Sequence, residues 1–251
     1  MIPKMIHYCW FGGKPLPELA ARCIASWRKY LPDFEIKEWN ESNFDVRQIP
    51  YVAQAYERGK HAFVSDYARF KIIHEQGGIY FDTDVEVIKP LDDILAKGAF
   101  FGIEASRGEF FCAPGLGFAC PAGFSLCKEM CERYESMDFV DATGNCNLKT
   151  VVRIMSELLL EKGFAPSNDI VEFNGAYFYP PEYFCPVNYY TGEKNITVNT
   201  RTIHHYAASW VPAPQKLSLP ARMLYRTGLQ DTGLAKVLLD FYHVFKKPRK
   251  S

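Results

Sequence analysis

The sequence lacks several features that would assign a chain to a class at once. Its opening stretch, "MIPKMIHYCWFGGKPLPELA", has no long apolar segment, because Lys4, His7 and Lys14 interrupt it. We therefore expect neither a signal peptide nor a membrane span of roughly 20 apolar residues. An excess of one charge is also absent, since 29 Lys and Arg balance 29 Asp and Glu. This balance argues against nucleic acid as a partner.

Cysteine motifs for metal binding are also missing. None of the 8 cysteines belongs to a C-x-x-C pair. Cys127 and Cys131 stand four apart on an expected helix, but no histidine follows at zinc spacing. Without an export signal, reduced and mostly buried thiols are expected, in keeping with a cytoplasmic location.

What the sequence has is length and apolar content. A chain of 251 residues with 48% hydrophobic residues can form one large domain, or one domain with a small appendage. "KMIHYCWFGG" reads as a strand, "ELAARCIASWRKYL" as a helix and "FEIKEW" as a second strand, which together predict a parallel β-α-β unit. A helix is expected from about residue 62 to 76, ended by Gly77 and Gly78. "IYFDTDVEVI" then returns to strand character, so the fold class is α/β.

The second half is less regular. "NLKTVVRIMSELLLEKGF" predicts a helix with a glycine stop, and "ITVNTRTIHHYAASW" contains a candidate strand. Between them lies an aromatic-rich stretch that either packs in the core or forms a stacking platform for acceptor sugars. Its aromatic residues are Tyr177, Phe178, Tyr179, Tyr183 and Phe184.

Asp82 and Asp84 lie between two apolar runs, where carboxylates are costly to place. Side chains at i and i+2 of a strand point the same way, so the two project together if the strand persists, or converge if it bends. Two hard carboxylates form half of a site for Mg²⁺ or Mn²⁺, with positions left for water and phosphate oxygens. On the preceding helix, Asp66 and Arg69 are three apart and share one face. They form either a surface ion pair or a pair aimed at sugar hydroxyls.

These residues carry a family resemblance. "SDYARFKIIHEQGGIYFDTDVEVIKPL", "IPKMIHYCWFGGKPLP" and "IHHYAASW" resemble, in order and spacing, the signature blocks of glycosyltransferase family 32. Members of that family are DxD-containing enzymes with a GT-A nucleotide-sugar-binding fold and a mostly parallel central sheet. The resemblance implies a catalytic domain over residues 1–215 and leaves 216–251 as a helical, basic tail. One departure is "DATGNCNLKT", where relatives often show Thr-Gly-Pro, so Asn145 and Asn147 are not assigned to the site.

The resemblance also implies roles. The DxD aspartates, Asp82 and Asp84, would bind Mn²⁺ or Mg²⁺, with either His204 or His205 completing the metal shell. Trp10 would stack on the nucleobase, and Gly12 would let the backbone approach it. The donor-sugar and diphosphate contacts would come from Asp66, Arg69, Tyr80, Ser209 and Trp210. The implied reaction is retaining transfer of a hexose to a glycan or lipid-linked glycan of a surface polysaccharide such as a capsule. UDP-linked donors are favoured, and GDP-mannose is the alternative.

Two other functions fit parts of this pattern. A protein of the same fold could bind a nucleotide sugar without turnover. Phosphatases of the haloacid-dehalogenase type also place an aspartate after a hydrophobic strand, but "EVIKPLDD" follows too closely to supply their second acidic cluster. No dedicated carboxylate nucleophile is evident, so front-face attack is favoured over a covalent route.

The tail pattern suggests a surface contact. Apolar residues at helical spacing in "AKVLLDFYHVF" precede Lys246, Lys247, Arg249 and Lys250. An apolar stripe followed by a basic cluster is typical of a segment that lies on an anionic membrane. The alternative is packing on the catalytic domain. The membrane interpretation predicts peripheral contact with the inner face of the cell membrane.

Overall fold

The structure is a computed structural model, and it describes residues 1–106 and 108–207. Ser209, Trp210 and the tail 216–251 lie outside the described residues. No helix in those two ranges is long and apolar enough to cross a membrane. The helices are α1 (Glu18–Tyr30), α2 (Pro50–Glu57), α3 (His61–Gln76), α4 (Asp92–Leu95), η1 (Pro114–Leu116, a 3₁₀ turn), α5 (Ser125–Glu135), α6 (Val151–Glu161) and α7 (Pro181–Phe184). The strands are β1 (Met5–Cys9), β2 (Glu35–Trp39), β3 (Gly78–Tyr80), β4 (Val85–Val87), β5 (Ala99–Ser106), β6 (Glu109–Cys112), β7 (Phe118–Cys120), β8 (Val171–Phe173), β9 (Ala176–Tyr179) and β10 (Thr202–His204).

The main sheet runs in the order β2-β1-β3-β7-β5-β9-β8, with β6 paired to β5. The pairs β1–β2, β1–β3 and β5–β9 are parallel, and β7 is antiparallel to both of its neighbours. The predicted β-α-β unit is therefore confirmed, and so is the α/β fold class. A small second sheet pairs β4 with β10. It matters for the site because β10 ends at His204 and His205 follows it directly.

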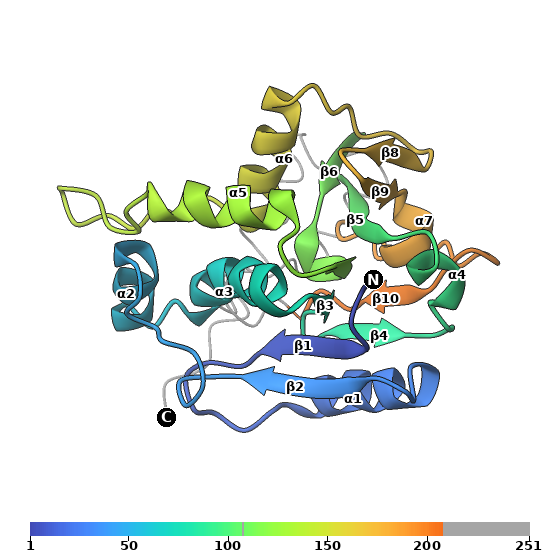
Figure 1. The fold of residues 1–251 in the computed structure, drawn as a ribbon, viewed down its shortest axis with the longest axis horizontal. Coiled ribbons are helices and arrows are strands. Elements are labelled where there is room, and N and C mark those ends of the chain that lie inside the picture. Colours follow the sequence, from blue (N-terminus) through green and yellow to red (C-terminus); the bar gives the residue numbers. More distant parts are fainter. Residues whose placement is uncertain (107, 208–251) are drawn as a thin grey trace, which may run out of the picture.

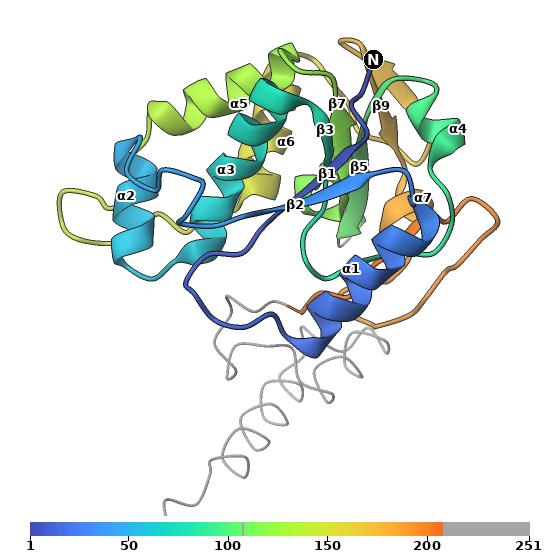
Figure 2. The ribbon, with the colours of Figure 1, turned by 60° about the horizontal axis from the view of Figure 1, so that its bottom comes forward.

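Helices cover both faces of the sheet (Figures 1 and 2). Side chains of a strand alternate between its two faces. Thus Ile79 joins the apolar cluster under α1, whereas the next residue, Tyr80, joins the cluster under α2, α3, α5 and α6. Phe100 and Phe101 divide between the two clusters in the same way. The strands are thus packed on both faces.

The predicted helix from 62 to 76 is confirmed as α3, and Gly77 ends it with a φ of 67°. The strand predicted over 79–88 is interrupted. It splits into β3 and β4, and a turn between them has the amide of Val85 donating to the carbonyl of Asp82 at 3.0 Å. The backbone therefore bends at the two aspartates.

The aromatic-rich stretch near residue 180 belongs mainly to the core. Phe178, Tyr179 and Phe184 are each at most 1% exposed. Phe184 stacks on Phe100 with ring centroids 5.0 Å apart. The idea of a sugar-stacking platform is wrong for these three rings. The cysteines agree with expectation, since all are free thiols and all but Cys146 are buried.

Candidate active site

The candidate site lies beyond the carboxyl ends of β1 and β3. These strands are parallel neighbours, with His7 paired to Tyr80 and the amide of Phe81 donating to the carbonyl of His7 at 3.1 Å. Trp10 follows one strand and Asp82 follows the other. In open α/β sheets, ligands bind in the crevice at these strand ends. The topology therefore brings two predicted site residues, 72 positions apart in the chain, to the same edge.

A buried guanidinium organises the first part of the site. Arg69 Nη2 lies 2.9 Å from Asp66 Oδ1 and 3.3 Å from Asp82 Oδ1, and the Arg69 side chain is only 4% exposed. Tyr80 supports the same group, because its ring lies 4.9 Å below the guanidinium and its hydroxyl donates to Asp82 at 3.0 Å. Asp66 and Arg69 are therefore part of a buried network, and the surface ion pair considered from the sequence is wrong.

Two carboxylates share this one guanidinium. Burial raises the pKa of Asp66 and of Asp82, and the positive charge of Arg69 opposes both shifts. The charge of Asp82 adds to the rise at Asp66, and the charge of Asp84 adds to the rise at Asp82. The backbone N–H of Val151, at the start of α6, also donates to Asp66. That helix end was not predicted as part of the site. Its side-chain cap, Thr150, is a recognisable sequence signal for a helix start.

Asp84 has a different partner. The antiparallel pairing of β4 and β10 sets Val85 opposite His204. His204 Nε2 then lies 3.3 Å from Asp84 Oδ1, with side-chain exposures of 16% and 15%. His205 turns to the other side, where its Nε2 is 2.8 Å from Glu86 Oε2. Of the two candidate histidines, His204 is therefore the one that faces the DxD aspartates.

The segment after β10 wraps around Asp84. The amides of His205 and Ala207 donate to the carbonyl and to Oδ2 of Asp84, at 3.0 and 2.7 Å. Reaching that geometry puts Tyr206 at a φ of 49°, a conformation that costs a non-glycine residue about 1 kcal/mol or more. The ring of Tyr206 lies 4.3 Å from that of His204. No pattern in the sequence indicated this role of Tyr206.

These contacts shift the pKa values of Asp84 and His204 in opposite directions. Burial acts to raise the pKa of Asp84, but the charge and hydrogen bond of His204 and the amide of Ala207 outweigh it and lower the pKa to about 2. Burial acts to lower the pKa of His204, but Asp84 outweighs it, and the net pKa of His204 is raised. A carboxylate at Asp84 is thus the stable form at neutral pH.

Gly115 forms the opposite wall, which sequence reasoning missed. The amide of Asp82 donates to the Gly115 carbonyl at 3.2 Å. A Cβ built on Gly115 would overlap Oδ2 of Asp82, and it would come within 3.5 Å of the Arg69 guanidinium. The backbone of η1 therefore packs directly on the carboxylate, at a point where only glycine fits. The glycines of "APGLG" were the available signal.

The predicted nucleobase end is built from β1 and its following loop. Trp10 is half-buried, and its indole N–H donates to the carbonyl of Lys14 at 2.5 Å. Gly12 has a φ of 94°, and its amide donates to Glu41 at 2.6 Å. A Cβ on Gly12 would overlap the ring of His61. The close backbone approach expected at Gly12 is thus present, but the neighbour that requires it is His61.

The donor set suits a divalent metal in part. Carboxylate oxygens and an imidazole are ligands that Mn²⁺ accepts, and Asp84 and His204 present both within a few ångströms. Asp82 is held by Arg69 and Tyr80. Among the described residues, no three His, Cys, Asp or Glu side chains come together as a metal-binding group. The chemistry of Asp84 and His204 fits a metal whose other ligands come from the donor phosphates and water.

Part of the chain is similar to known glycosyltransferases. Residues 17–101 match the family model described as "Glycosyltransferase sugar-binding region containing DXD motif". This segment is therefore similar to the DXD glycosyltransferases of the family 32 type. Over 111 residues the chain is 31% identical to the uncharacterized glycosyltransferase L373 of Acanthamoeba polyphaga mimivirus, covering 40% of this chain and 43% of that protein. It is 29% identical over 108 residues to inositol phosphoceramide mannosyltransferase 1 of Schizosaccharomyces pombe, covering 39% and 33%.

The match to these glycosyltransferases is partial, since the chain spans less than half the length of both relatives. Among solved structures, the PaToxG glycosyltransferase is similar over 64% of this chain and 70% of that one, at 18% identity and a TM-score of 0.47. The β-α-β start and the mixed sheet described above agree with the α/β fold class expected from the sequence.

Proposed function

We propose that this glycosyltransferase moves a hexose from a nucleotide sugar to a glycan or lipid-linked glycan of a surface polysaccharide, with retention of anomeric configuration. The observation that supports this most is the buried set of Asp66, Arg69 and Asp82 beside the Asp84–His204 pair. A buried charge network at strand ends is costly, and a structural role alone would not require it.

The side-chain exposures of these residues suggest different roles for them. The side chain of Asp82 is 31% exposed, against 11% for Asp66 and 4% for Arg69. Asp82 is therefore the member most open to a donor. Arg69 and Tyr80 hold its carboxylate from behind. We propose that Asp82 contacts the donor and that Arg69 positions it.

Asp84 and His204, with Asp82, would hold Mn²⁺ or Mg²⁺. When bound, the metal would act as a Lewis acid that stabilises the nucleoside diphosphate leaving group. Trp10 would stack on the base, and Ser209 and Trp210 would contact the diphosphate. We favour front-face attack, in which the leaving phosphate oxygen accepts the proton of the acceptor hydroxyl.

The donor is proposed as a UDP-hexose, and the name of the S. pombe relative adds mannose as a candidate sugar. The test is incubation of the purified chain with UDP-hexoses and GDP-mannose, with Mn²⁺ or with a chelator. We expect slow, metal-dependent release of a nucleoside diphosphate from one donor. Tight donor binding without release would favour a non-catalytic binder. Release from none, together with phosphatase activity on simple phosphomonoesters, would favour the haloacid-dehalogenase alternative.

A further inference from the structure

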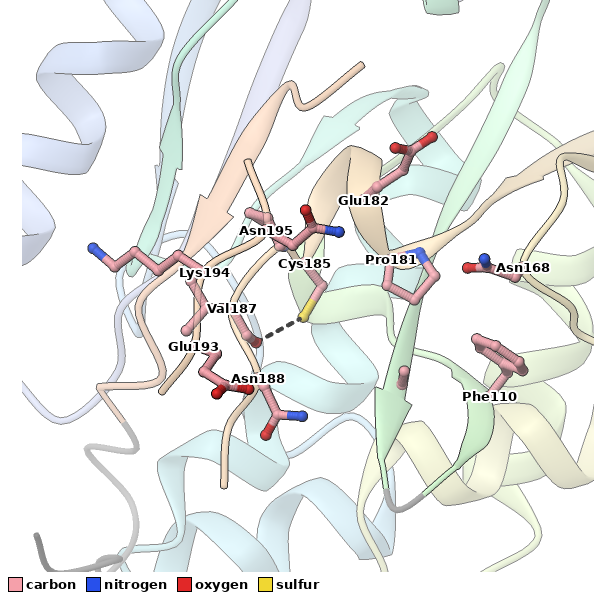
Figure 3. Close-up of a pocket in the computed structure, with 12 residues that line it drawn as sticks. Phe110, Asn168, Pro181, Glu182, Cys185, Val187, Asn188, Glu193, Lys194 and Asn195 are labelled. Carbon is pink, nitrogen blue, oxygen red and sulfur yellow. Dashed lines mark hydrogen bonds between the residues drawn. The ribbon is translucent and has the colours of Figure 1, made fainter. Parts of the chain in front are cut away.

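A cavity with a volume of about 800 Å³ opens beside the candidate active site, and none of the roles above uses it. Its walls come from the end of β5, from β6, from the segment before β8, from α7 with the residues after it, and from a loop over 186–195 (Figure 3). That loop is closed by a bridge between Val187 and Lys194 and by the amide of Asn195 donating to the carbonyl of Pro186 at 2.8 Å. The loop that forms this wall of the cavity is therefore held by its own backbone hydrogen bonds. The volume of the cavity lies in the range of small-molecule sites.

The lining has the chemistry of a carbohydrate site. Three side-chain amides, those of Asn168, Asn188 and Asn195, line it together with the ring of Phe110. Amides donate and accept, as sugar hydroxyls do, and an aromatic face packs on sugar C–H groups. Asn188 Oδ1 already accepts backbone amides of its own loop. The side chains of Asn168 and Asn195 make no hydrogen bond with any described residue, so both are available to a ligand.

The charges favour a neutral ligand. Glu182 and Glu193 contribute two carboxylates to the lining, against one ammonium from Lys194. Both oxygens of Glu182 are occupied, because Thr197 and Asn199 donate to them at 3.0 Å each. A phosphate or another anion would meet carboxylates here. A hydroxyl-rich neutral group would not be repelled.

The cavity is connected to the active site through two side chains, Cys185 and Tyr206. Cys185 lies in the cavity wall, and its Sγ is 2.8 Å from the hydroxyl of Tyr206. The Tyr206 ring in turn packs on His204, the partner of Asp84. An occupant of the cavity would thus be separated from His204 by the side chains of Cys185 and Tyr206.

From this chemistry and placement, we propose that the cavity is the subsite for the acceptor sugar, a neutral glycoside held by Asn168 and Asn195. The proposal rests on the transferase function argued above. It adds where the acceptor binds and which groups recognise it.

The test uses two variants that act differently. Asn195→Ala removes an amide, and Ala105→Trp fills the cavity from the exposed end of β5. Their matched controls are Asn145→Ala and Ala142→Trp, which lie in the exposed turn over 141–145 that follows α5. All four are compared with wild type by saturation-transfer NMR on methyl α-mannoside, methyl β-glucoside and methyl β-galactoside. Donor hydrolysis without acceptor is measured in parallel.

We expect at least one glycoside to bind wild type and both controls. Asn195→Ala should weaken that binding about five- to tenfold, the usual effect of losing one hydrogen bond to a neutral group. Ala105→Trp should abolish it, and donor hydrolysis should stay within twofold in all four variants. Equal glycoside binding by wild type and Ala105→Trp, or no binding of any glycoside to wild type, would overturn the acceptor subsite. Failure of the transferase function would appear separately, as absent donor hydrolysis in wild type.

Discussion

Gly115 packs its backbone directly against the carboxylate of Asp82. Its carbonyl accepts the Asp82 amide at 3.2 Å, and no room remains for a Cβ beside Oδ2. Asp82 is thereby enclosed by Gly115 in front and by Arg69 and Tyr80 behind. The position of this carboxylate is set by groups from three separate parts of the chain.

Gly115→Ala should therefore damage activity more than stability. The added methyl must displace the Asp82 carboxylate, and a misplacement near 1 Å can cost about 100-fold in rate. We expect metal-dependent donor hydrolysis to fall by about that factor, while the melting temperature falls by a few degrees. Asp82→Ala already lacks the carboxylate that the methyl group would displace. The double variant Asp82→Ala with Gly115→Ala should therefore be no less active than Asp82→Ala alone. Wild-type hydrolysis by Gly115→Ala would show that the position of Asp82 is unimportant.

Asp84→Ala should abolish donor hydrolysis and also destabilise the fold. In the structure, Asp84 accepts the amide of Ala207 and pairs with His204, so alanine removes the acceptor that both half-buried groups share. The expected loss is about 1–3 kcal/mol of unfolding free energy.

Asp84→Asn is the matched variant, since its amide oxygen can still accept from Ala207. It should recover most of the stability and none of the activity, as measured by urea unfolding and donor hydrolysis. Activity in Asp84→Asn above a few percent of wild type would argue against a charged metal ligand at this position.

Trp10→Ala should raise the donor KM more than it lowers kcat. Base stacking exists in both ground and transition states, so its loss weakens binding uniformly. Stacking on one base is worth about 1–3 kcal/mol, which predicts an increase in KM of roughly 5- to 150-fold. Trp10→Phe keeps a ring and should lie between wild type and alanine. A fall in kcat at unchanged donor affinity would contradict the stacking role.

His7 should make the protein acid-sensitive. Burial lowers its pKa to about 4. The hydrogen bonds of His7 also favour the neutral ring. Trp39 donates to Nδ1 at 3.0 Å, and Nε2 lies 2.9 Å from the Gly77 carbonyl. A second ring proton, on Nδ1, would therefore face the indole N–H of Trp39. A folded pKa below the unfolded value of about 6.5 means that the unfolded chain binds the proton first. Stability contributed by neutral His7 is thus complete above about pH 6.5 and is lost as pH falls toward 4.

The size of this loss follows from linkage, at about 1.4 kcal/mol per pKa unit, or roughly 3 kcal/mol in total. Urea unfolding at pH 7.0 and 4.5 measures it, and NMR of the His7 ring reports its titration directly. His7→Gln supplies the background from other groups, because it cannot titrate. A His7 ring that titrates near 6.5 would contradict the prediction.

The sequence by itself determined the local elements and the identity of the main reactive groups. The spacing in "ELAARCIASWRKYL" and the double glycine after Gln76 were enough to predict α1, α3 and the parallel start of the sheet. Asp82 and Asp84 were recognisable because carboxylates between apolar runs have few structural reasons to exist. Local periodicity and residue chemistry carry this information without any long-range contact.

Only the tertiary structure decided how those groups are arranged. The choice of His204 over His205 depends on the register of β10 against β4, and a shift of one residue would exchange them. The bend at Asp82, the wall formed by Gly115 and the strained Tyr206 arise where distant segments pack together. No local pattern specifies such contacts, because their geometry is fixed by the packing of the whole core.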